Sequence, residues 1–217
     1  MKNTKKNILI TALRLFARNG YDAVSVSQIA GELGMTKGAL YKHFKSKRDI
    51  FDSIFAYVCQ LDMERSRKTG VPEKEFSEMP ESFSDVSPES LKTYMTSQFY
   101  YWSEDETACN FRKMLTLEQY KTVEMNDLYQ KVMTSGPLNY IEHLLCEMMK
   151  DKEQIPHSSR QMAVEFYAPF HLLLSISDAV PQKEEKEKLA EEYVRYMDQF
   201  FEKYALIPEQ KNRKETI

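Results

Sequence analysis

The chain has 217 residues, with 30 Lys and Arg against 33 Asp and Glu side chains, and only six glycines and eight prolines. This length is sufficient to bury a core without disulfides or metal ions, and the composition favours helix over sheet. Three widely spaced cysteines argue against a disulfide framework or a zinc site and fit a reducing, cytoplasmic location. No run of about 18 apolar residues occurs, so we expect no transmembrane helix. We do not expect the basic and then apolar N-terminus to be a signal peptide, because Arg14 and Arg18 interrupt its apolar positions and no small-residue cleavage site follows.

Positive charge is concentrated at the N-terminus. Residues 1–48 hold ten basic and two acidic side chains, a net charge of +8, which leaves −11 on the rest of the chain. A basic head on an acidic body indicates a polyanionic partner for the head alone. The alternative is that these lysines form an ordinary solvated face.

Four helices are predicted in the first third of the chain, and each has a recognisable start or stop. Their apolar residues recur at helical spacing over residues 4–19, 26–33, 36–44 and 46–67. Gly20 and Gly34 end the first two, while Ser25 or Ser27 caps the second, Thr36 the third and Ser46 the fourth. The fourth helix is long enough to join two domains.

Five more helices are predicted in the acidic body. Residues 69–87 contain Pro72 and Pro80 and lack helical periodicity, so we expect a loop there. Ser87-Pro88-Glu89 then has the form of a helix start. The predicted helices cover residues 88–103, 105–119, 122–150, 158–179 and 184–205, with breaks expected at Gly136-Pro137 and at Pro169. The fold class is therefore all-α, with about nine helices.

The second and third helices, separated by a glycine turn, form a helix-turn-helix pattern. In the segment TKGALYKHF, Ala39, Leu40 and Phe44 fall on one apolar face. The opposite face carries Lys37, Tyr41, Lys42 and His43. Gly38 has no side chain to keep this helix out of a DNA major groove. Ser46 and Lys47 lie at the start of the next helix, where backbone N–H groups suit a phosphate.

Residues 5–51 resemble the DNA-binding domain of the tetracycline-repressor (TetR) family. The resemblance is carried by LFARNGYDAVSV and then by IAGELGMTKGALYKHFKSKRDIF, a little over a fifth of the chain. It implies that Ser25, Thr36, Tyr41 and Lys47 hold phosphates. It also implies that Ser27, Lys37, Gly38, Lys42 and His43 lie at or near base edges, with a phosphate contact as the alternative for His43. For Tyr41 the alternative is packing at the rim of the domain.

The family implies a helical C-terminal domain that dimerises and holds a small molecule. We accordingly expect a helix-turn-helix DNA-binding domain at 1–48, a linking helix at 49–67, an acidic loop at 68–87, a ligand-binding and dimerisation bundle at 88–207 and a tail at 208–217. The homodimer interface is expected on the last two helices, 158–179 and 184–205. Phe166, Phe170, Leu172, Leu173, Leu174 and Ile176 offer more apolar surface there than one partner helix covers, unless this helix is a central, buried one.

A ligand cavity in the body is expected to be lined by Met, aromatic and polar side chains, which form adaptable walls. The candidates are Trp102, Cys109, Phe111, Met114, Tyr120, Tyr140, Phe166, Tyr167, Phe170 and His171. Few basic residues lie among these positions, which favours a neutral or cationic apolar effector. The alternative is that these side chains are plain core.

The expected function is a sequence-specific, dimeric transcriptional repressor that a small apolar effector releases from a palindromic operator in double-stranded DNA. One alternative is a redox-responsive regulator, although the cysteines lie among apolar neighbours with few cations to activate them. A helical enzyme is the other alternative, but the chain has no P-loop, nucleophile elbow, HExxH or dinucleotide-binding glycine pattern. We expect no catalytic residues, no cofactor, no metal site and no membrane partner.

Overall fold

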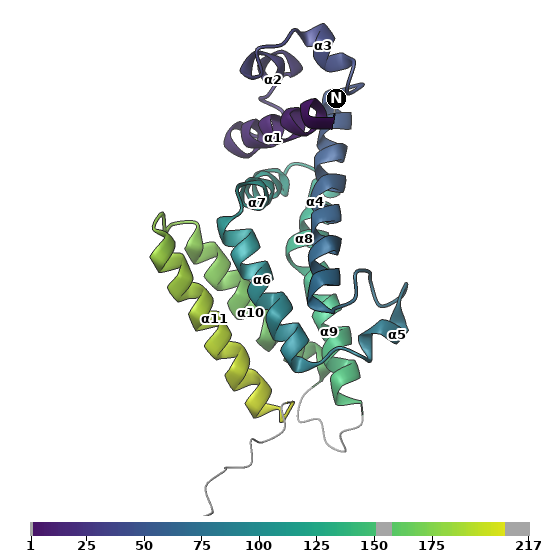
Figure 1. The fold of residues 1–217 in the computed structure, drawn as a ribbon, viewed down its shortest axis with the longest axis vertical. Helices are drawn as coiled ribbons and strands as arrows, with labels where there is room; N and C mark the ends of the chain where they lie inside the picture. The colour runs from purple at the N-terminus through teal and green to yellow at the C-terminus, as the bar shows by residue number, and fades with distance from the viewer. Residues whose placement is uncertain (1, 151–157, 207–217) are drawn as a thin grey trace, which may run out of the picture. The chain divides into compact units, whose positions relative to one another are not determined.

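The structure is a computed structural model that describes residues 2–150 and 158–206 (Figure 1). These residues form eleven helices and no strand, which confirms the all-α prediction. The helices are α1 (Lys2–Asn19), α2 (Val26–Glu32), α3 (Lys37–Tyr41), α4 (Lys47–Thr69), α5 (Pro80–Phe83), α6 (Pro88–Glu104), α7 (Glu106–Glu118), α8 (Val123–Met133), α9 (Ser135–Met149), α10 (Ser159–Ser177) and α11 (Lys183–Lys203). Within the described ranges, every helix is too short or too polar to span a bilayer.

The described residues belong to two compact units. Unit 1 takes those within Met1–Arg67 and Tyr100–Pro137, and unit 2 takes those within Lys68–Phe99 and Leu138–Ile217. Residues 49–67, predicted as a linking helix, therefore belong to the same unit as the N-terminal helices, as do α7 and α8. The predicted tail at 208–217 lies outside the described residues.

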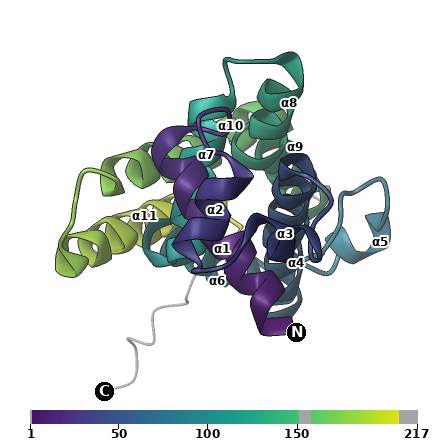
Figure 2. The ribbon, with the colours of Figure 1, turned by 90° about the horizontal axis from the view of Figure 1, so that it is seen from above.

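Helices α1 to α3 form around a small apolar core. Ile8, Phe16, Ile29 and Leu40 are fully buried, so one face of each short helix points inward. Between α2 and α3, Gly34 adopts φ +62°, a left-handed conformation that glycine accommodates without strain. This turn brings the two helices together, and Figures 1 and 2 both show α3 near the N-terminal end of α4.

The rest of unit 1 packs through aromatic contacts. Phe111 of α7 is fully buried, with its ring centroid 6.0 Å from that of Phe55 on α4 and 6.4 Å from that of Trp102. The Arg65 guanidinium lies 3.2 Å from the centre of the Tyr101 ring, a cation–π contact. Burial raises the pKa of Tyr101 to about 12.

Unit 2 is held together by α6, α9, α10 and α11. Phe166 of α10 lies 4.9 Å, centroid to centroid, from Phe200 of α11, and these two helices pack side by side. The ring of Phe99, on the part of α6 in this unit, is 5.9 Å from each of Phe170 and Tyr193. Phe166, Phe99 and Tyr193 are fully buried, so α6, α10 and α11 share one core.

Residues 69–87 differ from the predicted loop because they contain the short helix α5. Phe83 of α5 is fully buried and lies 5.3 Å from the Tyr140 ring of α9. The Tyr140 hydroxyl donates a 2.7 Å hydrogen bond to the carbonyl of Pro72, and Phe76 stacks on His143 at 4.5 Å. The sequence pattern could not predict these contacts, because the buried residues of this segment follow no helical or strand period.

Two predicted helix breaks are misplaced. The segment 122–150 divides at Thr134, the C-cap of α8, and Pro137 lies in the first turn of α9, where its missing N–H has no intrahelical partner to lose. Conversely, α10 continues through Pro169 as one helix of 19 residues. The additional helix α5 and the division of 122–150 account for eleven helices where about nine were expected.

Candidate DNA interface

The two helices of the helix-turn-helix are capped by residues that were predicted to hold phosphates. Ser25 forms a capping box with Gln28: its hydroxyl accepts from the Gln28 N–H at 3.2 Å, and the Gln28 side chain accepts from the Ser25 N–H at 2.7 Å. The Thr36 hydroxyl accepts from the Ala39 N–H at 3.2 Å. Both side chains are exposed, as is Ser27. The hydroxyl protons are not consumed by these caps and can still be donated to a phosphate oxygen.

Helix α3 is shorter than predicted and ends at Tyr41. Leu40 and Phe44 are buried and Ala39 is half-buried, which agrees with the predicted inner face. Lys37, Gly38, Tyr41 and Lys42 are exposed, and the Lys37 ammonium lies 5.9 Å from the centre of the Tyr41 ring. Lys42 and the half-buried His43 lie in the turn after the helix, where the His43 N–H bonds to the Leu40 carbonyl at 2.9 Å.

Lys47 binds the loop between α1 and α2. Its ammonium donates to the carbonyls of Tyr21 at 2.9 Å and Asp22 at 3.4 Å, and it lies 4.2 Å from the centre of the Tyr21 ring. An ammonium has three N–H donors, so a phosphate contact is compatible with both bonds. Ser46 caps α4 by accepting from the Asp49 N–H at 3.0 Å.

The same loop is bonded from its other side by the end of α7. Glu118, whose side chain is 2 % exposed, accepts from the Tyr21 N–H and from the Lys121 ammonium, both at 2.8 Å. Lys121 also pairs with Asp22 at 3.3 Å. The loop is therefore held between the start of α4 and the end of α7. Local sequence patterns do not reveal this arrangement, because Glu118 and Lys121 lie about a hundred residues from the loop and Lys47 lies 26 residues from Tyr21.

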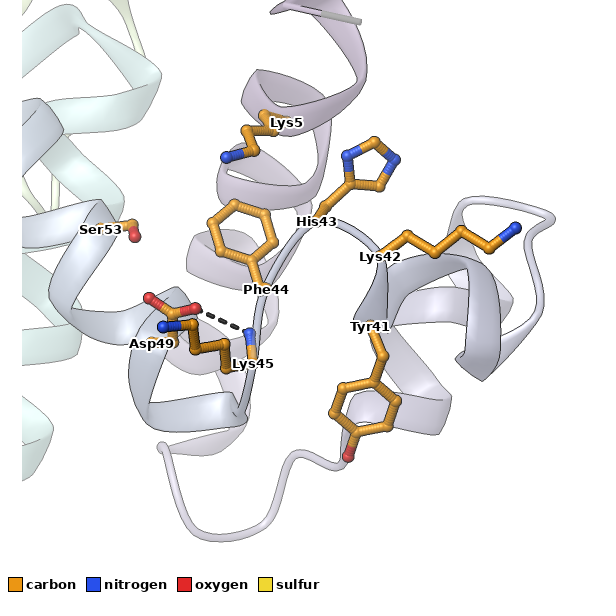
Figure 3. Close-up of a pocket in the computed structure, with 8 residues that line it drawn as sticks. All are labelled: Lys5, Tyr41, Lys42, His43, Phe44, Lys45, Asp49 and Ser53. Carbon is orange, nitrogen blue, oxygen red and sulfur yellow. Dashed lines mark hydrogen bonds between the residues drawn. The ribbon is translucent and has the colours of Figure 1, made fainter.

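A hollow of about 280 Å³ lies beside α3. It is lined by side chains from three segments of unit 1, namely Lys5, Tyr41, Lys42, His43, Phe44, Lys45, Asp49 and Ser53 (Figure 3). We call this cavity, with these lining residues, the α1–α3 hollow. Lys5 and Lys45 belong to the basic head that the sequence predicts, but it predicts no contact for them. Their places in the hollow depend on how α1 packs against Phe44.

The predicted ligand-lining residues fall into both units. Trp102, Cys109, Phe111 and Met114 belong to unit 1, and the Cys109 thiol contacts the Trp102 carbonyl at 3.4 Å. In unit 2, Phe166, Tyr167 and Phe170 are buried and His171 is half-buried, whereas Tyr140 packs on α5. Tyr120 is 87 % exposed. The candidates therefore form two separate clusters plus one surface residue.

Helix α10 exposes only part of the apolar set that was expected at the interface, namely Leu172 and Ile176. Phe166, Phe170, Leu173 and Leu174 are buried within the chain itself, because they pack on α6 and α11. The exposed apolar residues of α10 are Val164, Ala168, Leu172 and Ile176. Their spacing of four residues places them in one ridge on the outer face of the helix.

The cysteines are all free, and they differ in exposure. Cys59 and Cys109 are half-buried, and burial raises the pKa of the Cys59 thiol, which disfavours the reactive thiolate. Cys146 is exposed, contrary to the expectation that every cysteine is packed. Within residues 2–150 and 158–206, no three His, Cys, Asp or Glu side chains gather as metal ligands.

Comparison with known sequences agrees with the predicted family. Residues 8–54 match "Bacterial regulatory proteins, tetR family". The uncharacterized HTH-type transcriptional regulator YerO of Bacillus subtilis is 38 % identical over 80 residues, which is 35 % of this chain and 28 % of that protein. The chain spans between 28 % and 44 % of the length of the first curated relatives that it matches.

Solved structures share the whole fold. The complex of triclosan with SmeT, of Stenotrophomonas maltophilia, has a TM-score of 0.66 at 20 % identity, covering 93 % of this chain and 91 % of that one. The transcriptional regulator FadR of Bacillus subtilis, in complex with stearoyl-CoA, has a TM-score of 0.62 at 21 % identity, covering 88 % and 96 %. At these identities the likeness is one of fold.

Proposed function

We propose that this chain, which belongs to the tetR family of bacterial regulatory proteins, is a sequence-specific DNA-binding transcriptional regulator that acts as a dimeric repressor. The observation that carries the proposal is the exposed face of α3 and its following turn, where Lys37, Gly38, Tyr41 and Lys42 project from a buried apolar core. This face lies within the segment that matches the family.

The proposed contacts divide into two kinds. Ser25, Thr36, Tyr41 and Lys47 bind phosphates, which fixes the position of the protein on the duplex. Lys37, Lys42, His43, Ser27 and the backbone at Gly38 face the base edges in the major groove, which gives sequence preference. Lys37 and Lys42 are the strongest candidates for base contacts, because lysine donates to the O6 and N7 acceptors of guanine.

A dimer places two such heads on a palindrome whose half-sites are one helical turn apart, about 34–36 Å, or a multiple of it. The proposed interface lies on α10 and α11. The exposed ridge Val164, Ala168, Leu172 and Ile176 supports it, since a second copy of the chain would remove this apolar face from water.

A small apolar effector is proposed to release the operator. An effector that binds only the state with wrongly spaced heads would shift the population toward that state. The two aromatic clusters, around Trp102 and Phe111 in unit 1 and around Phe166 and Phe170 in unit 2, supply candidate binding residues. Triclosan and stearoyl-CoA, the ligands of SmeT and FadR, both carry large apolar parts, which supports the same class here.

The decisive test is a footprint of the purified full-length protein on the DNA upstream of its own gene, followed by selection from genomic fragments. We expect a protected palindrome with two equivalent half-sites. Lys37→Ala should weaken binding by about 1–3 kcal/mol and relax the preference at one base pair of each half-site. Equal affinity for all fragments, with no protected palindrome, would refute the proposed function.

A further inference from the structure

The α1–α3 hollow differs from the exposed face of α3 because it is concave and is built from three parts of unit 1. Lys5 comes from the second turn of α1, Tyr41 to Lys45 come from the end of α3 and its turn, and Asp49 and Ser53 come from α4. Figure 3 shows the Lys5 side chain beside the Phe44 ring, whereas the Lys42 side chain extends away from both. The hollow therefore lies at the C-terminal end of α3, beside the proposed recognition surface.

The lining of the hollow has a net positive charge. The lining residues include three lysines, Lys5, Lys42 and Lys45, and one acidic residue, Asp49. The Asp49 carboxylate accepts a 2.7 Å hydrogen bond from the Lys45 backbone N–H, so part of its charge is directed at the turn. Phe44, which is 5 % exposed, has its ring 5.7 Å from the Lys5 ammonium, and Ser53 adds a hydroxyl donor.

The size of the hollow limits its occupant. Pockets that enclose drug-sized ligands have volumes of about 300–1,000 Å³ and mostly apolar walls. At about 280 Å³, with cations from α1 and from the turn after α3, the hollow suits one small anionic group better than an apolar effector. Because Tyr41 and Lys42 line it and also belong to the face proposed to meet DNA, an anion that is part of the same duplex is the occupant that both surfaces can share.

We propose that the α1–α3 hollow receives a DNA backbone phosphate at the edge of each half-site, held by Lys5 and Lys45. This inference rests on the proposed function and extends the DNA contact from the helix-turn-helix to α1. The phosphate carries no sequence information, so these two lysines fix the position of the head on the duplex while α3 reads the bases. Lys42 would then link the two sets of contacts.

The neighbouring residue Lys6 supplies a matched control. It is exposed, lies on the same turn of α1, and its ammonium is 5.6 Å from the centre of the Tyr57 ring. It does not line the hollow. Substituting Lys6 removes the same charge from nearly the same place in the sequence, and so it measures the general effect of charge loss.

The experiment measures affinity for the footprinted operator and for random DNA over a range of salt concentrations. The proteins compared are full-length wild type, Lys5→Ala, Lys5→Gln, Lys45→Ala and Lys6→Ala. Each substitution of Lys5 or Lys45 should reduce the slope of log K against log salt by about 0.9, the value for one lost phosphate contact. Specific and random DNA should lose affinity by similar factors. Ethylation of phosphates should identify one interfering phosphate per half-site that ceases to interfere in Lys5→Ala.

The outcomes separate the two proposals. If wild type binds its operator but Lys5→Ala and Lys5→Gln lose no more slope than Lys6→Ala, the hollow holds no phosphate and only this inference fails. A loss confined to the operator would assign Lys5 to a base and would also overturn it. If wild type binds no DNA, both proposals fail. Equal urea midpoints for all variants exclude unfolding as the cause of any loss.

Discussion

Gly20 combines a left-handed backbone with two charged side chains close to the place where a Cβ would lie. It has φ +82°, and a Cβ there would be 3.3 Å from the Glu118 carboxylate and 3.3 Å from the Lys121 ammonium. Gly20→Ala should lower the free energy of unfolding by about 1–2 kcal/mol from the left-handed backbone alone. Gly31, inside α2 with open space around it, is the control. Gly31→Ala should raise the same quantity by about 0.5–1 kcal/mol, as alanine does in helices. Both are measured by urea denaturation, and destabilisation of equal size at both positions would contradict the prediction.

Tyr193 buries its hydroxyl without a hydrogen-bond partner among the described residues. Its side chain is fully buried, and burial raises its pKa well above the ordinary value of about 10. Tyr193→Phe keeps the ring contacts with Phe99 and Phe170 and removes the unpaired group. The free energy of unfolding at neutral pH should therefore rise by about 1 kcal/mol.

The same residue predicts a loss of stability in alkaline solution. Below pH 10 the folded and unfolded chains both keep the Tyr193 proton, so its contribution is constant. Above pH 10 only the unfolded chain releases it, and stability should fall by up to about 1.4 kcal/mol per pH unit. The urea midpoint at neutral pH and the midpoint about one unit above the ordinary tyrosine pKa of about 10 should differ less in Tyr193→Phe than in wild type. An identical alkaline loss in both proteins would show that Tyr193 titrates normally.

At the scale of elements, α10 has two faces with different roles. Its inner face packs on α11 and α6, whereas Leu172, 61 % exposed, lies in the middle of the outer ridge. Leu172→Glu should leave the fold intact but raise the dimer dissociation constant at least tenfold, because it would bury an unpaired carboxylate on each side of the interface. Sedimentation over a concentration series measures this effect.

The matched control for the α10 ridge is Val123→Glu. Val123 is 79 % exposed at the start of α8, outside the proposed interface. The substitution introduces the same charge on an exposed apolar position, and a carboxylate is favourable at a helix N-terminus. It should leave the dissociation constant unchanged. A dimer that withstands Leu172→Glu would require a different interface.

Helix order and the N-terminal faces follow from short-range patterns, which is why they could be predicted. Caps such as Ser25 and Thr36 act within three residues, and Leu40 and Phe44 follow the helical period. By contrast, Phe83, the Glu118 bond to Tyr21 and the approach of Lys5 to Phe44 depend on segments distant in the chain. Pro169 was misread for a related reason, since tertiary packing sustains a helix that local propensity would interrupt.

At the scale of the whole molecule, the chain contains one tryptophan, so its tryptophan fluorescence comes from a single residue. Trp102 is 8 % exposed and lies 6.4 Å from the Phe111 ring, within one of the proposed ligand clusters. Titration with an apolar effector that binds this cluster should change the Trp102 emission with a saturating curve and should release operator DNA over the same concentration range. Trp102→Phe should lose the signal but retain the release. Release without any change in emission would move the effector away from Trp102.

The loop from Gly20 to Val24 has a consequence for how the N-terminal helices loosen. The Tyr21 N–H donates a hydrogen bond to the buried carboxylate of Glu118 on α7. The Tyr21 carbonyl accepts one from Lys47, the first residue of α4. That amide proton can exchange with solvent only when Glu118 withdraws. The exchange rate of this amide in heavy water therefore measures how often α7 detaches from the DNA-binding head. The measurement needs neither an effector nor an operator.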